Sequence, residues 1–330
     1  MIRRIFVLSV IFLSALFSFV TDIPVFAQSK GSDEVTLRMS WFPYADYAMY
    51  TIGIKKGFYQ DQGIEVKIAP TKGSALATKV ISIREAEFAS ASADATLMAR
   101  IKGMPLKVLA TLHQTSPVSI FSLEKIGIKE LKDLEGKSLA SDPASLKHKQ
   151  FIAFCKKNGI DIEKINILPI RGSNFVHILE GRADSMLAFG YIGDAMLRKK
   201  GYMINEIKLK DYGIDIYSIS LITNDNLIKE NPDLVRRFVA ATVKSWNYAA
   251  SHPEETVDAY VEAYPELKKE DQFYQVTGVI SLAQSEYTKR HGLGYQSKEK
   301  WQKTQDLLYE QGVVDKEIDV EEVYTNQFLP

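Results

Sequence analysis

The chain has 330 residues, enough for one large domain or for two domains of ordinary size with substantial cores. Its 41 lysines and arginines balance 41 aspartates and glutamates, so no long-range electric field would attract nucleic acid or an anionic membrane. The single cysteine, Cys155, excludes an intramolecular disulfide, so the hydrophobic core must stabilise the fold.

Residues 1–27 have the pattern of a secretory signal peptide. Two arginines precede an apolar run at residues 5–20, and Val25 and Ala27 mark a cleavage point before Gln28. The competing interpretation, a retained membrane anchor, is disfavoured because this run is shorter than the roughly 20 residues that span a bilayer. No cysteine lies near the cleavage point, so we expect a protein without a lipid anchor that is released into the periplasm.

After the signal peptide, short β-rich segments alternate with longer segments of helical period, which is the pattern of parallel strands joined by crossover helices. The first block predicts strands at 35–40, 64–69, 88–91 and 106–111, with helices at 46–56, 74–84 and from residue 93. The second block predicts strands at 118–123, 137–140, 165–169 and 185–189, with helices at 144–157, 175–180 and 193–199. A strand at 217–223 then precedes helices at 232–251, 253–263 and 298–311.

These elements predict an α/β protein with two doubly wound lobes joined by a two-segment hinge. Lobe 1 comprises residues 35–120 and 219–330, including the C-terminal helices, and lobe 2 comprises residues 121–218. The chain is expected to leave the first lobe near residues 117–122 and to return near residues 216–222. The cleft between the lobes is then the expected ligand site.

The turns that follow the strands are the segments to inspect, because ligands of doubly wound sheets bind beyond the carboxyl ends of the strands. The first turn carries the rings of Trp41, Tyr44 and Tyr47 beside the carboxylate of Asp46. Asp46 can cap the following helix or bind a ligand, and the rings can pack the loop or stack on a ligand. Aromatic faces beside an acid suit a flat heterocycle that donates hydrogen bonds.

Two further turns place hydroxyl groups and backbone N–H groups at a helix start. Ser92 and Asp94 do so in the first lobe, and Ser141 and Ser145 do so in the second. Such groups serve a helix cap and a ligand oxygen equally well. Asp142 in the second turn opposes a strongly anionic ligand, because like charges repel.

The last two turns of the second lobe add a cation and more rings. Arg171 is either solvated or a ligand contact, whereas the basic segments 147–149 and 198–200 are expected to be solvated helix faces.

The complete set of predicted ligand-binding residues is Trp41, Tyr44, Asp46, Tyr47, Ser74, Ser92, Asp94, Gln114, Ser141, Ser145, Arg171, Asn174, Phe189, Tyr191, Asp194 and Tyr217.

The sequence carries no familiar catalytic motif. It has no G-x-S-x-G elbow, no Walker A loop and no H-E-x-x-H pair, and its scattered histidines give no support for a metal site. Cys155 lies in an apolar helical segment and is expected to be a buried, unreactive thiol. We therefore expect binding without a cofactor, and the competing class is a secreted enzyme that acts on a similar small molecule.

Several motifs resemble those of periplasmic binding proteins that serve ABC importers. They are KGFY at 56–59 followed by QGIEV at 62–66, LKDLEGK at 131–137 and LEGRAD at 179–184, together with residues 158–160, 211–213, 231–235 and 251–254. The resemblance implies a two-lobe fold of type II and a monomer. It also implies that the lobes close on a small molecule and deliver it to a permease in the inner membrane.

The subfamily that the chain most resembles binds pyrimidine precursors of thiamine. It shares the opening Trp41-x-Pro43 and an ending similar to residues 324–330, and close relatives take riboflavin, alkanesulfonates, taurine or nitrate. Tyr44 and Tyr47 stand where pyrimidine binders commonly have Asn and His, which changes the available hydrogen bonds and leaves these ligands open. A eukaryotic pyrimidine synthase of the same superfamily uses a Cys-rich motif and histidines, which this chain with its single cysteine does not match.

Overall fold

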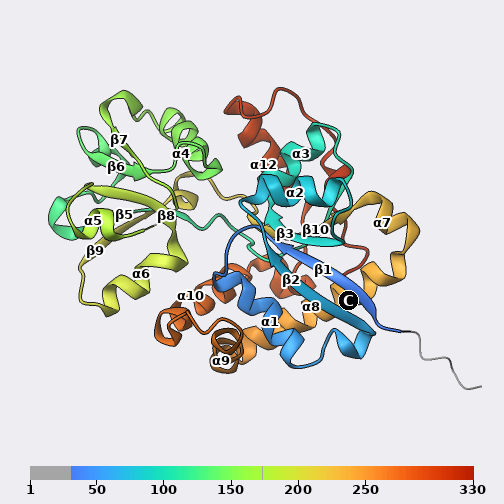
Figure 1. Cartoon of the computed structure of the whole chain (residues 1–330). Helices are drawn as coiled ribbons and strands as arrows, with labels where there is room; N and C mark the ends of the chain where they lie inside the picture. Colours follow the sequence, from blue (N-terminus) through green and yellow to red (C-terminus); the bar gives the residue numbers. More distant parts are fainter. Residues whose placement is uncertain (1–30, 173) are drawn as a thin grey trace, which may run out of the picture. The chain divides into compact units, whose positions relative to one another are not determined.

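Two β-sheets organise the part of the chain that the structure describes, which is residues 31–172 and 174–330 of a computed structural model (Figure 1). The predicted signal peptide, residues 1–27, lies outside these residues. The first sheet contains β1 (Asp33–Met39), β2 (Ile64–Pro70), β3 (Phe88–Ser92), β4 (Leu106–Thr111) and β10 (Ile219–Asn224), in the order β2-β1-β3-β10-β4. The second contains β5 (Val118–Leu123), β6 (Ser138–Ser141), β7 (Asn166–Pro169), β8 (Ser185–Phe189) and β9 (Ile204–Lys208), in the order β7-β6-β8-β5-β9.

The sheets are mixed, which corrects the prediction of parallel strands. β1 is parallel to β2 and β3, but β10 is antiparallel to β3 and β4. In the second sheet β5 is antiparallel to β8 and β9. The reversed strands are those by which the chain enters a sheet from the other one, so no crossover helix constrains their direction.

The first sheet has a hydrophobic core on each face because its side chains alternate between the two faces. Leu37, Phe88 and Leu221 face one core, whereas Ala89 and Ile222 face the other. Helices α1 (Ala48–Lys55) and α8 (Pro232–Ser251) cover the first of these faces, and α2 (Ser74–Ser82), α3 (Ala93–Ile101) and α12 (Lys298–Glu310) contribute to the core on the second (Figure 1). We call this sheet and its helices lobe 1.

The second sheet repeats the arrangement on a smaller scale. Ile120 and Leu187 face one core with Phe151 and Phe154 of α4 (Leu146–Lys157). The opposite core includes residues of α5 (Val176–Leu179) and α6 (Gly190–Lys199). We call this sheet and its helices lobe 2. The residue limits that the sequence predicts for the lobes and their hinge stay predictions.

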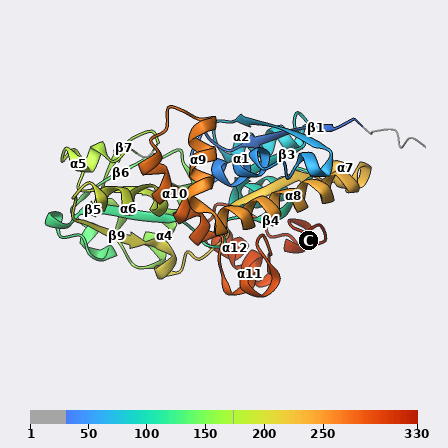
Figure 2. The ribbon, with the colours of Figure 1, turned by 90° about the horizontal axis from the view of Figure 1, so that it is seen from below.

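Four more helices follow β10 in the chain besides α8 and α12. They are α7 (Asp225–Glu230), α9 (Pro253–Ala263), α10 (Lys269–Leu282) and α11 (Glu286–His291). α8 and α9 contact α1, and α10 contacts both α9 and α6 of lobe 2 (Figure 2). Within the described residues, no helix combines the length and apolar character needed to cross a membrane.

The sequence analysis missed four of these elements and placed the start of α6 late. β9, α7, α10 and α11 were not predicted, and α6 begins at Gly190 rather than at residue 193. β9 was not predicted because apolar and polar residues alternate over only a few positions in its sequence, INEIK, which does not distinguish a strand from a loop. The early start of α6 matters because it places Tyr191 on a helix that faces lobe 1.

Cys155 is fully buried in α4, and burial raises the pKa of its thiol to about 12. A raised pKa keeps the thiol protonated at pH 8, and the thiolate is the reactive form. We therefore expect no reaction with a chromogenic disulfide reagent at pH 8 in buffer, and one thiol titrated per chain in denaturant. Rapid labelling of the folded protein would contradict this burial.

Candidate functional site

A buried carboxylate joins the two lobes at the start of the first helix. Asp46 lies in the turn between β1 and α1, and none of its side chain is exposed. One carboxylate oxygen is 2.6 Å from Nε2 of His113, and the other accepts a hydrogen bond of 3.2 Å from the hydroxyl of Tyr191. His113 follows β4 in lobe 1, whereas Tyr191 belongs to α6 in lobe 2.

Aromatic rings surround this carboxylate. The ring of Tyr191 meets the ring of His113 edge-on at 5.6 Å between centroids, and Tyr44 meets Tyr47 in the same way at 5.8 Å. Burial and the negative charge of Asp46 raise the pKa of Tyr191 and of Tyr44 well above the ordinary value. Both hydroxyls therefore stay protonated at neutral pH and can donate hydrogen bonds.

A second buried carboxylate, that of Asp94, stands at the start of α3. One oxygen accepts a 2.7 Å hydrogen bond from the backbone N–H of Ala95, and the other accepts one from the amide of Gln150 in α4 of lobe 2. Burial raises the pKa of Asp94. Both carboxylates of lobe 1 thus receive a donor from lobe 2.

Lobe 2 contributes rings and a partly buried cation next to Tyr191. The ring of Phe189 lies 5.7 Å from that of Tyr191, and the ammonium of Lys147 lies 4.6 Å from the centre of the Phe189 ring. An aromatic face attracts such a cation. Burial lowers the pKa of Lys147 to about 8, so its ammonium is still mostly charged at neutral pH.

The prediction of a solvated face at residues 147–149 is wrong for His148. This side chain is buried, and its Nδ1 lies 2.9 Å from the hydroxyl of Ser141. His148 shares a helix face with Phe151 and Cys155, because residues three and seven positions apart align, and that face packs against the second sheet. Only Lys149 is exposed, as predicted for a solvated face.

Several predicted site residues have their hydrogen bonds satisfied within the protein. The amide of Gln114 bonds to backbone oxygens of Thr111 and Tyr295 and to the hydroxyl of Ser285. Tyr217 is buried and accepts from the N–H of Ser297. The other members of this group are Ser74, which accepts from the N–H of Ser92, and Ser145, which caps α4.

Three further predicted residues, Trp41, Arg171 and Asn174, have exposed side chains. Trp41 is 46% exposed, and its carbonyl accepts a 2.6 Å hydrogen bond from the buried Tyr47. Arg171 and Asn174 are exposed in the turn after β7. Asp194 lies on α6, and its side chain is outside the described part of the chain.

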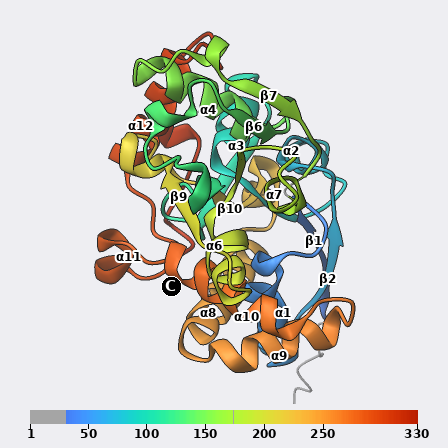
Figure 3. The ribbon, with the colours of Figure 1, turned by 90° about the vertical axis from the view of Figure 1, so that its left-hand side faces the viewer.

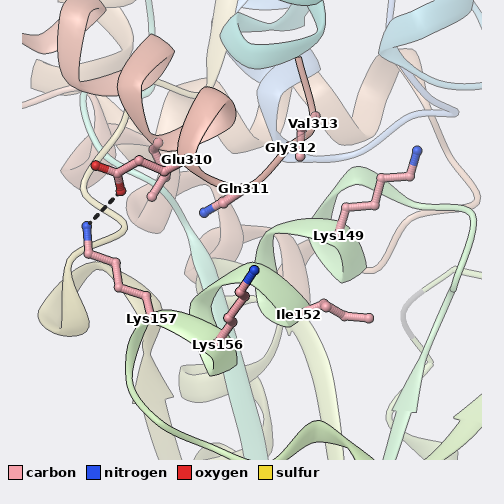
Figure 4. Close-up of a pocket in the computed structure, with 9 residues that line it drawn as sticks. Lys149, Ile152, Lys156, Lys157, Glu310, Gln311, Gly312 and Val313 are labelled. Atoms are coloured by element: carbon pink, nitrogen blue, oxygen red, sulfur yellow. Dashed lines mark hydrogen bonds and ion pairs between the residues drawn. The ribbon is translucent and has the colours of Figure 1, made fainter. Parts of the chain in front are cut away.

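A pocket of about 760 Å³ lies elsewhere, between α4 and the end of α12 (Figure 4). Lys149, Lys156 and Gln311 contribute to its lining, and Lys157 forms a 3.5 Å ion pair with Glu310 at its edge. The residues that line it include no aromatic ring and none of the predicted site residues. We therefore place the candidate site at the buried carboxylates of Asp46 and Asp94, because each accepts a hydrogen bond from lobe 2 and rings lie beside Asp46.

His113 and Gln150 are the site residues that the sequence analysis missed. His113 comes two residues after β4, so the rule of inspecting the turns after strands could have found it, as it found the neighbouring Gln114. Gln150 sits in the middle of α4, where no local signal distinguishes it. Within the residues that the structure describes, no group of acids, histidines or cysteines could hold a metal ion.

Replacing Asp94 with asparagine is expected to stabilise the protein at pH 7 by about 1 kcal/mol, because the uncharged amide avoids the cost of burying a charge. The raised pKa means that the native state takes up a proton at a higher pH than the unfolded chain does. The unfolding free energy of the wild type therefore falls as pH rises from the unfolded pKa of Asp94 through its higher native pKa. The advantage of the variant shrinks as pH falls through the same range.

Urea unfolding of both proteins between pH 4 and pH 7 measures this difference. Asp133→Asn is the matched control, because backbone N–H groups of Lys129 and Glu130 lower the pKa of Asp133 and its carboxylate stabilises the fold at neutral pH. Its substitution is expected to have the opposite sign. An Asp94→Asn effect that does not vary with pH would rule out a charged, buried Asp94.

A family model described as NMT1/THI5 like matches residues 45–256, which is more than half of the chain. The chain belongs to the NMT1/THI5 like family. The matched segment contains both buried carboxylates and their partners from lobe 2.

Relatives of the chain in this family include both binding proteins and synthases. The riboflavin-binding protein RibY of Chloroflexus aurantiacus is 25% identical over 90% of this chain and 86% of that protein. A 4-amino-5-hydroxymethyl-2-methylpyrimidine phosphate synthase of Legionella pneumophila is 22% identical over 92% and 95% of the two chains. The formylaminopyrimidine-binding protein of Halalkalibacterium halodurans is 19% identical over 70% and 71%.

Solved structures share the two-lobe fold. The periplasmic aliphatic sulphonate binding protein SsuA of Escherichia coli matches with a TM-score of 0.66 at 12% identity, over 88% of this chain and 91% of that one. The alkanesulfonate-binding protein SsuA of Xanthomonas axonopodis pv. citri, bound to MOPS, gives the same TM-score at 12% identity, over 88% and 98%. The fold is therefore that of periplasmic binding proteins, as the sequence motifs predicted.

Proposed function

We propose that the protein is the solute-binding component of an ABC import system. It captures a small aromatic or heterocyclic molecule between its two lobes and delivers it to a permease in the inner membrane. Residues near 113–117 and 213–218 carry the hinge, since the chain passes between the sheets there. Closure on a ligand that touches both lobes distinguishes the loaded receptor from the empty one by shape.

The observation that carries this proposal is the pair of buried carboxylates that face lobe 2. Asp46 and Asp94 each accept a hydrogen bond from a side chain of lobe 2, so a ligand that donates to them would lie between the lobes. The rings of Tyr44, Tyr191 and Phe189 supply the flat walls of the site. Two carboxylates select a neutral or cationic ligand with N–H donors over an anion.

A pyrimidine precursor of thiamine is the favoured ligand. An aminopyrimidine presents an amino group to a carboxylate and a flat ring to the tyrosines, which is what Asp46 and Tyr191 offer. The formylaminopyrimidine-binding relative supports this choice. Sulfonate, taurine and nitrate are less suited, because Arg171, the cation proposed for them, is exposed in the turn after β7.

Riboflavin is the second candidate. The similarity to the riboflavin-binding protein spans 90% of the chain, against 70% for the formylaminopyrimidine-binding protein. A three-ring ligand would extend further, and the exposed rings of Trp41 and Phe42 at the end of β1 provide more stacking surface.

Two experiments test the proposal. Native mass spectrometry of the protein as purified would identify a retained ligand by its mass. A thermal-shift panel of thiamine pyrimidines, riboflavin, taurine, alkanesulfonates and nitrate then ranks the candidates, because a ligand at about 100 times its dissociation constant adds roughly 2.7 kcal/mol to stability. Stabilisation by taurine, sulfonate or nitrate alone would overturn the choice of a heterocycle.

We propose a monomeric periplasmic receptor rather than an enzyme, although a relative is named as a synthase. The sites of Asp46 and Asp94 hold donors and acceptors but no activated nucleophile. Mass spectrometry of the ligand after incubation with the protein separates the two classes. A receptor returns the ligand unchanged, whereas an altered mass would establish an enzyme.

A further inference from the structure

Helix α6 of lobe 2 docks along α10 of lobe 1, and Tyr191 of α6 lies directly against Gly278 of α10. The two helices lie side by side in each view (Figures 1 to 3). A Cβ atom added at Gly278 of α10 would lie 2.4 Å from Cβ of Tyr191 and 3.2 Å from its Cα. Only glycine therefore permits this approach.

The far ends of the same helices are joined by charge. Lys199, the last residue of α6, and Lys200, which follows it, form ion pairs of 3.4 Å and 3.9 Å with Glu270 and Asp271 of α10. Exposed pairs of this kind contribute little individually and are screened by salt. The contacts of Tyr191 with Gly278 and with the buried carboxylate of Asp46 are less exposed to this screening.

A second contact between the lobes joins α4 to the start of α3. Gln150 of α4 donates to the carboxylate of Asp94, and both side chains are buried. All of these contacts are made by the chain with itself. These contacts between the lobes therefore need no ligand to form.

We propose that Tyr191 and Gln150 form a two-point latch that keeps the ligand-free protein closed for much of the time. This inference rests on the proposed function, because it assigns the latch to the carboxylates of the same site. A ligand that donates to Asp46 or Asp94 replaces the latch donors. Each hydrogen bond to a buried carboxylate shifts the ratio of closed to open molecules by roughly tenfold or more.

Distance measurements on the ligand-free protein test the latch. Nitroxide labels on Glu85→Cys in lobe 1 and Glu163→Cys in lobe 2 sit on exposed positions, and the buried Cys155 stays unlabelled. Pulsed electron spin resonance then reports the fractions of closed and open molecules. Native mass spectrometry first confirms that no ligand remains.

Tyr191→Phe removes only the hydroxyl, and Gly278→Ala places a methyl group against Tyr191. Both are expected to lower the closed-to-open ratio, by roughly tenfold for Tyr191→Phe. Alanine also favours helix α10 over glycine, so Gly278→Ala leaves lobe 1 folded. Ser281→Ala on the exposed side of α10 is the matched control and is expected to match the wild type.

Two results would overturn the latch. In the first, the ligand-free wild type has the same open fraction as Tyr191→Phe. In the second, both Tyr191→Phe and Gly278→Ala remain as closed as the wild type. Neither result would change the interpretation of the ligand screen. Conversely, a protein that is closed without ligand but is stabilised by none of the screened molecules would retain the latch and argue against the proposed function.

Discussion

Replacing Asp46 with asparagine is expected to weaken binding of the ligand identified in the screen by roughly 10- to 150-fold. This range corresponds to the loss of one charge-assisted hydrogen bond of about 1.5–3 kcal/mol. Asparagine preserves the shape of the side chain. Its oxygen can still accept from His113, while its amino group faces the hydroxyl of Tyr191, which can accept as well as donate.

Isothermal titration calorimetry measures this loss of affinity, and two other variants serve as controls. Asp61→Asn changes an exposed carboxylate of lobe 1 and is expected to leave affinity unchanged. Arg171→Ala, in the exposed turn after β7, is also expected to have little effect. Full affinity in Asp46→Asn together with weak binding in Arg171→Ala would move the site to lobe 2 and indicate an anionic ligand.

The Phe238→Ala variant is expected to lose about 3–5 kcal/mol of unfolding free energy, the usual range for truncating a buried aromatic side chain. Phe238 belongs to α8 and stacks face to face on Phe88 of β3, with centroids 3.9 Å apart and planes inclined by 5°. It also lies 5.3 Å from the ring of Tyr59. The three rings join α8 to the first sheet, so their loss leaves a cavity in the larger core of lobe 1.

Urea unfolding followed by circular dichroism provides the measurement. Asn247→Ala, on the exposed side of the same helix, is the matched control and is expected to stay within about 0.5 kcal/mol of the wild type. Hydrogen exchange adds a local readout, because protection should fall first in α8 and β3. A loss below 1 kcal/mol in Phe238→Ala would show that the core can collapse around the missing ring.

Strand and helix positions were predictable where the local pattern is long and bounded. The limits of β4, β5, β8, α8 and α9 agree with the sequence prediction, because each is a continuous β-rich or amphipathic run. Strand direction was not predictable for β5 and β10. Their local sequences resemble those of the other strands, and direction depends on which sheet the chain has just left.

The residues of the candidate site also fall into those that the sequence predicted and those that only the tertiary structure identified. The sequence by itself singled out Asp46, Asp94 and Tyr191, because each follows a strand in a fold whose ligands bind at strand ends. Only the tertiary structure decided that His113 and Gln150 reach these carboxylates, and that His148 turns inward. Such pairings join residues 56 or 67 positions apart in the chain, so they depend on how the sheets and helices pack rather than on any local periodicity.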